Sequence, residues 1–178
     1  MANRRDLRVV KTQRALSSAM LSLLDRVPFT KITVNDLCAE ALVSRSAFYA
    51  HYQDKYSLLM CTLNRLSEDL FAQTAAADFK GELAVILQKV QQESKTFKNL
   101  LIAEYDGELM TLLRTGFIAQ LHRREGLQFM PSLPEPREVS SVFFAAGFAG
   151  IIMQWVAGDL AYTPEEMTSC LHALLTGE

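Results

Sequence analysis

Residues 32–52 read ITVNDLCAEALVSRSAFYAHY and carry start signals for two short helices in quick succession. Thr33 can accept a hydrogen bond from the free N–H groups of a helix start, and Asp36 favours the positive end of that helix. Ser44 is a second residue of the capping type. The sequence thus predicts a short helix at about 34–41, a tight turn at 42–43 and a second short helix at about 45–52.

The apolar residues of this stretch lie where they would hold the two helices together: Leu37, Ala41, Val43 and Phe48. The outer face of the second helix is then polar, with Arg45, Ser46, Tyr49 and His51. A short helix with such groups fits the major groove of DNA, where arginine binds guanine through two hydrogen bonds. We therefore expect a helix-turn-helix that binds DNA.

The remaining chain shows helical periodicity throughout, so we expect an all-α fold of about nine helices. Asp54 and Thr163 are the clearest further helix starts, and Asp78–Gly81 is expected to be a break between helices. The other helices are expected at about 7–26, 55–74, 82–94, 97–104, 107–124, 137–158 and 164–175.

The charge distribution separates an N-terminal third from the rest. The 178 residues are 49% hydrophobic and carry a net charge of −2, which by itself argues against a nucleic-acid binder. Residues 1–55, however, hold nine basic and five acidic side chains and so carry +4, leaving −6 for the remainder. A basic head on an acidic body is typical of a DNA-facing domain joined to a separate domain. We expect a helix-turn-helix domain over 1–55 and a helical effector-binding and dimerisation domain over 56–178.

Several functional classes are disfavoured by what the sequence lacks. Its cysteines form no CxxC pair and its histidines no metal-ligand spacing, so we expect no metal and no cofactor. No nucleophile elbow or phosphate-binding loop is present, which makes an enzyme the weakest alternative. The apolar run 142–158 is shorter than the ~20 residues of a membrane span, and the charged N-terminus is no signal peptide. We expect a cytoplasmic protein without a membrane segment, with buried thiols at Cys38, Cys61 and Cys170.

Residues 8–60 resemble the DNA-binding domain of the TetR (tetracycline-repressor-like) family of regulators. The matching segments are Ile32-Thr33-Val34 and the aromatic stretch 48–52, followed by Lys55 and Leu58-Leu59. The resemblance implies that Phe48 and Tyr52 pack inside the head. It implies DNA contacts by Thr33, Ser44, Arg45, Ser46, Ala47, Tyr49, His51 and Lys55, with His51 and Lys55 on phosphates. For His51, a role that only bridges helices stays equally open.

Leu42 departs from the family pattern, which commonly has glycine in this turn. A leucine there needs a different backbone angle or carries strain.

Residues 143–152 with Trp155 resemble the C-terminal region of a subgroup that includes regulators of dihydroxyacetone kinase operons, some of which respond to a partner protein. A helix that is apolar on most faces needs cover, and a second subunit would supply it through a four-helix interface. The expected dimer contacts are Phe144, Gly147, Phe148, Gly150, Ile151, Trp155 and Leu171. A helix that is simply central in a monomer is the alternative. The resemblance also implies an effector pocket in the body, with Phe71, Phe97, Phe117, Gln120 and Met153 as candidates by position.

These observations predict a homodimeric repressor that binds a near-palindromic operator in double-stranded DNA and is released by a small-molecule effector. Two alternatives stay open. One is an activator or co-regulator controlled by a partner protein, and the other is an interaction module that has kept the head but lost operator binding.

Overall fold

The structure, a computed structural model, describes residues 4–74, 78–101, 111, 115 and 136–176. Every element within these residues is helical, which confirms the all-α prediction. The helices are α1 (Arg4–Leu24), the 3-10 helix η1 (Phe29–Lys31), α2 (Val34–Glu40), α3 (Arg45–Tyr49), α4 (Lys55–Thr74), α5 (Phe79–Gln92), α6 (Ser94–Leu101), α8 (Arg137–Ala157) and α9 (Pro164–Thr176). The helix expected at 107–124 falls almost entirely outside the described residues.

The predicted helix starts are present as hydrogen-bonded caps. Thr33 Oγ1 accepts the Asp36 N–H at 3.2 Å, while the Asp36 carboxylate accepts the Thr33 N–H at 2.9 Å. Ser44 Oγ accepts the Ala47 N–H at 3.1 Å. Asp54 caps α4 in the same way, and Thr163 caps α9. Each cap satisfies N–H groups that a helix start leaves without an intrahelical partner, so each start is determined locally.

The break expected at Asp78–Gly81 is shorter than predicted, because α5 already begins at Phe79. Asp78 is itself the N-cap of α5, and its carboxylate accepts the Gly81 N–H at 2.8 Å. Gly81 therefore lies in the first turn of the helix, where the cap offsets its low helix propensity. A single residue, Glu93, then separates α5 from α6. Helix α3 ends at Tyr49, three residues earlier than expected.

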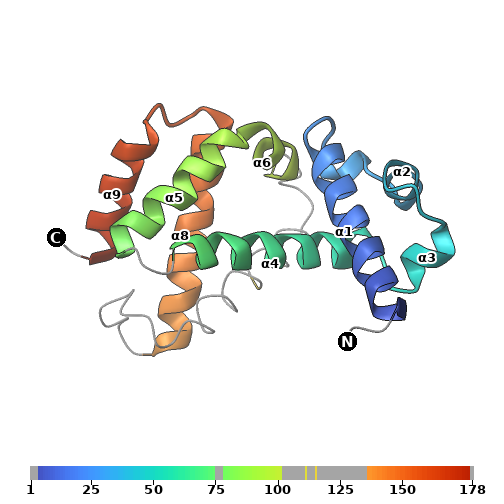
Figure 1. The fold of residues 1–178 in the computed structure, drawn as a ribbon. Coiled ribbons are helices and arrows are strands. Elements are labelled where there is room, and N and C mark those ends of the chain that lie inside the picture. Colours follow the sequence, from blue (N-terminus) through green and yellow to red (C-terminus); the bar gives the residue numbers. More distant parts are fainter. Residues whose placement is uncertain (1–3, 75–77, 102–110, 112–114, 116–135, 177–178) are drawn as a thin grey trace.

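Two hydrophobic clusters divide the molecule into a head, built on α1–α3 and the start of α4, and a body, built on α5, α8 and α9. These helices gather at opposite ends of the molecule, and α4 runs between the two ends (Figure 1). The head cluster includes Leu58 and Leu59 of α4 and Leu100 of α6. The core of the head thus extends past the expected boundary at residue 55.

Candidate nucleic-acid interface

The turn between α2 and α3 is a Schellman motif. The Val43 N–H donates to the Cys38 carbonyl at 3.0 Å, and the Leu42 N–H donates to the Ala39 carbonyl at 3.3 Å. Leu42 occupies the position that usually holds glycine, with φ 55°, and is the one non-glycine residue with positive φ in the described part of the chain. The expected departure from ordinary leucine geometry is therefore present. Its side chain is 92% exposed, so the left-handed backbone gains little from packing.

Helix α3 is anchored by Phe48, which is fully buried in the head cluster, and Tyr52 behind it is also buried. This confirms their expected packing roles. Burial raises the pKa of the Tyr52 phenol, whose hydroxyl donates to Cys61 Sγ at 3.7 Å. The anchored side leaves the opposite side of α3 to solvent.

The exposed side of α3 carries Arg45, Ser46 and Tyr49, and Tyr49 is half exposed. The Arg45 guanidinium carbon lies 5.8 Å from the centre of the Tyr49 ring, one helical turn away. A stacked arginine is pre-oriented, and its donors at the ring edge stay available for base edges or phosphates. Ala47 is half-buried and Ser44 is exposed.

Two of the residues predicted to contact DNA, Thr33 and Ser44, already form hydrogen bonds within the protein. The Thr33 hydroxyl donates to the Asp36 carboxylate at 2.6 Å, which leaves no hydroxyl proton for a phosphate oxygen. The hydrogen bonds from Thr33 hold the pKa of Asp36 below its usual range. Ser44 Oγ, besides capping α3, lies 2.9 Å from Ser46 Oγ. Thr33 is thus a cap in this structure and not a free phosphate donor.

His51 and Lys55 differ from each other. His51 is half-buried, and its ring centre lies 6.4 Å from that of Tyr52 in an edge arrangement, so phosphate contact and helix bridging both stay open. The Lys55 ammonium points into the protein and contacts the carbonyl oxygens of Phe29, Thr30 and Ile32. An ammonium has three N–H donors, and here they face three carbonyl oxygens of the protein. The phosphate contact of Lys55 stays a prediction.

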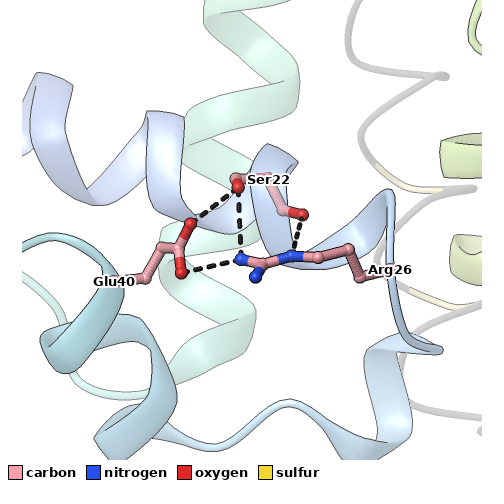
Figure 2. Close-up of polar contacts among 3 residues, drawn as sticks. All are labelled: Ser22, Arg26 and Glu40. Carbon is pink, nitrogen blue, oxygen red and sulfur yellow. Dashed lines mark hydrogen bonds and ion pairs between the residues drawn. The ribbon is translucent and has the colours of Figure 1, made fainter.

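A polar brace that sequence reasoning missed joins α2 to α1. Arg26 pairs with Glu40 at 2.7 Å, and Ser22 Oγ donates to the other carboxylate oxygen at 2.7 Å (Figure 2). Arg26 also donates to Ser22, at its carbonyl oxygen and its hydroxyl. The Arg26 and Ser22 hydrogen bonds lower the pKa of Glu40. The brace holds the last residue of α2, directly before the turn into α3, against α1.

Of the expected effector residues, the structure describes the side chains of Phe97 and Met153 only. Phe97 and Met153 are half-buried, and Phe97 packs against the body cluster. Phe71 lies in α4 with its side chain outside the description, and Phe117 and Gln120 lie outside it altogether. A cavity of about 300 Å³ lies elsewhere, lined by Leu21, Asp25 and residues 92–96 at the corner between head and body.

The expected dimer residues divide into two groups. Trp155 and Leu171 are buried in the body cluster, and Trp155 Nε1 donates to the Tyr162 carbonyl at 2.8 Å. Both side chains belong to the core of one subunit, which leaves little of either surface for a dimer contact. Phe148 and Ile151 are half-buried against the same cluster. Phe144 and Gly150 are half-buried and Gly147 is exposed, with nothing within 4 Å of a Cβ built on either glycine.

The exposed apolar surface of α8 lies nearer its N-terminus than expected. Val139 is 64% exposed, Val142 48% and Phe143 71%. Together with Ala146 and Gly147 they recur at helical spacing and form one stripe, hereafter the α8 stripe. Since the stripe continues to Gly147, it shares only its end with the surface expected from the sequence.

The cysteines also differ from expectation. Cys38 is buried, and burial raises the pKa of its thiol, whereas Cys61 is half-buried and Cys170 is exposed. Among the described residues, no group of histidine, cysteine and acidic side chains is placed to hold a metal ion. Of the helices that the structure describes, none has the length and apolar character needed to cross a membrane.

Comparison with known proteins was made with both sequence and structure. The family model for a transcriptional regulator C-terminal region, TetR_C_8, matches residues 80–177, more than half of the chain. The HTH-type transcriptional regulator YxbF of Bacillus subtilis (strain 168) is 30% identical over 81 residues, which are 45% of this chain. Those residues are 21% of YxbF, so the chain spans about a fifth of that relative.

Two solved structures resemble the whole chain. A TetR transcriptional regulator from Streptococcus agalactiae 2603V superposes with a TM-score of 0.70 at 26% identity, covering 97% of both chains. The dihydroxyacetone kinase operon activator DhaS superposes with a TM-score of 0.57 over 92% of this chain and 93% of its own. At 19% identity, DhaS shows a shared fold alone. Together with the family match, these findings show that the chain belongs to the TetR family of transcriptional regulators and carries its TetR_C_8 C-terminal region.

Proposed function

We propose that the protein binds double-stranded operator DNA as a homodimer through α3 and represses transcription until an effector releases it. Its family makes it a regulator and not an enzyme. One observation carries the DNA-binding part: Arg45 and Tyr49 are exposed and stacked on the solvent side of α3, while Phe48, whose ring meets the edge of Tyr49 at 5.3 Å, is buried. Such a face offers donors to base edges while the helix is held rigidly from behind.

The α8 stripe supports the homodimer. Phe143 at 71% exposure, with two exposed valines beside it, is an apolar surface that a second copy would cover. Gly147 adds a place for close helix approach, since a Cβ there would meet nothing within 4 Å. A two-fold dimer through this surface presents two copies of α3, which is the symmetry that a near-palindromic operator matches.

Helix α6 supports coupling between body and head. Asn99 Nδ2 donates to the Leu24 carbonyl at 2.8 Å and so caps the end of α1, while Leu100 is 4% exposed within the head cluster. Only Glu93 separates the start of α6 from the end of α5. An effector that displaces α5 or α6 would therefore shift α1, and with it the brace to α2.

The test of DNA binding compares Arg45→Ala and Tyr49→Ala with the wild type in gel shifts, on operators selected from a random DNA library. We expect each variant to lose on the order of ten-fold or more in affinity, and Arg45→Ala to relax the preference for guanine. Lys80→Ala and Tyr162→Ala remove an exposed basic and an exposed aromatic side chain from the body and serve as matched controls. Unchanged affinity and sequence preference in both α3 variants would overturn the assignment of α3 as the DNA-binding helix. A wild type that selects no DNA from the library would support the interaction module.

The dimer has its own test. Phe143→Asp places a charge in the α8 stripe, and we expect it to convert a dimer to a monomer in analytical ultracentrifugation at micromolar concentration. Tyr162→Asp makes the same kind of change at a site 56% exposed and away from the stripe, so it is expected to remain dimeric. A wild type that sediments as a monomer would contradict the proposal.

The sign of regulation follows from a reporter assay in which the gene is deleted. Increased transcription from the selected operator supports a repressor, and decreased transcription supports the alternative activator controlled by a partner protein.

A further inference from the structure

The side chain of Lys55, the first residue of α4, lies in a nest of backbone carbonyls. Its Nζ is 3.0 Å from the Phe29 oxygen, 3.3 Å from the Thr30 oxygen and 3.0 Å from the Ile32 oxygen. All three carbonyls belong to η1 and its cap, in the link between α1 and α2. Three acceptors thus meet a group with three N–H donors.

Two aromatic rings also lie close to this ammonium. Nζ lies 4.5 Å from the centre of the Phe29 ring and 5.6 Å from that of Tyr56. The two rings pack edge to face at 5.2 Å, and Phe29 is fully buried. Cation–π attraction adds to the hydrogen bonds and favours an ammonium that has left bulk water.

The Lys55 ammonium is stabilised by the carbonyls and not by α4. A cation at the start of a helix is disfavoured, because the macrodipole places positive partial charge there. The end of a 3-10 turn leaves carbonyls with free acceptor capacity, and Lys55 contacts three of them. The Phe29 oxygen also accepts the Ile32 N–H at 3.1 Å, so the ammonium is its second donor. Removing the ammonium would leave three partial negative charges facing one another beside a buried ring.

We infer that Lys55 is a positioning residue: its ammonium pins the start of α4 to the α1–α2 link, and so sets how α2 and α3 are held, without contacting a DNA phosphate. This inference extends the proposed function. Only the tests that use DNA rest on that proposal. The effect on DNA passes through the geometry of the head.

Salt dependence separates the two roles. Each phosphate contact contributes about 0.9 to the slope of log affinity against log salt concentration. We expect Lys55→Met to weaken operator binding at every salt concentration while the slope stays at the wild-type value. A slope reduced by about one, with unchanged thermal stability, would overturn the inference. Lys80→Met in α5 serves as the control for loss of an exposed charge.

Stability without DNA provides a second test that a failure of the DNA-binding proposal would not affect. We expect Lys55→Ala to lower Tm by on the order of 5 °C. Propylammonium chloride, whose ammonium can enter the carbonyl nest, should restore part of that loss. Tetramethylammonium chloride at equal ionic strength has no N–H donors and should not. Equal responses to both salts would overturn the inference.

If the alanine variant does not fold, the inference can still be tested with Lys55→Arg. Its charge is retained, but a planar guanidinium does not match three converging oxygens. We expect Lys55→Arg to be less stable than the wild type. Wild-type stability and affinity in Lys55→Arg would instead support a simple phosphate contact.

Discussion

Replacing Leu42 with glycine tests whether the left-handed backbone in the turn between α2 and α3 is strained. The residue has φ 55° and stands at the glycine position of a Schellman motif. Its side chain is 92% exposed, so the substitution removes almost no buried surface. The N–H that donates to the Ala39 carbonyl is kept. The change therefore acts mainly on backbone conformation.

The magnitude follows from two opposing terms. A side chain with a Cβ in the left-handed region costs roughly 1–2 kcal/mol. Glycine loses more backbone freedom on folding, which offsets about 0.5–1 kcal/mol of that gain. We expect Leu42→Gly to raise the free energy of unfolding by about 0.5–1 kcal/mol, which for a chain of this size corresponds to roughly 1–4 °C in Tm.

Chemical denaturation followed by circular dichroism measures this difference. Leu42→Ala is the matched control, because it removes the exposed side chain but keeps the Cβ that causes the strain. We expect the alanine variant to remain close to the wild type, so that the gain belongs to glycine alone. A glycine variant no more stable than the alanine variant would show that the left-handed backbone at Leu42 carries no strain.

Three further predictions concern how the head is held. The hydrogen bonds from Arg26 and Ser22 lower the pKa of Glu40 from its usual 4.5, so the stability they add is present above that pH and lost as pH falls through the lowered value. Urea denaturation should therefore find Glu40→Gln less stable than wild type at neutral pH and equal to it in acid; a constant difference would contradict the ionised pair. Leu100→Ala should cost about 2–5 kcal/mol in thermal unfolding, whereas exposed Lys98→Ala should cost little; equal losses would contradict the head-core role of Leu100. Asn99→Ala should weaken the response of DNA affinity to effector in titrations and leave basal affinity within a few-fold; an unchanged response would exclude this route of coupling.

Features that depend on residues close together in the chain are predictable from the sequence. Helix starts at Thr33, Ser44 and Asp54 were predictable because a cap acts over three residues of one chain. The buried positions of Phe48 and Tyr52 followed from the apolar pattern and the resemblance. At Asp78 the local signal was ambiguous, because a glycine three residues after a capping aspartate can mark either a break or a first turn.

Which helices contact one another depends on how the whole chain packs. The contacts of Lys55 depend on the link between α1 and α2, which passes close enough for three of its carbonyls to bind the ammonium. Arg26 and Glu40 pair because α1 and α2 cross, and Trp155 is core because α5 and α9 cover it. A sequence pattern shows which face of a helix is apolar or charged. It does not show what lies against that face, because the partners come from residues distant in the chain and depend on how the helices pack.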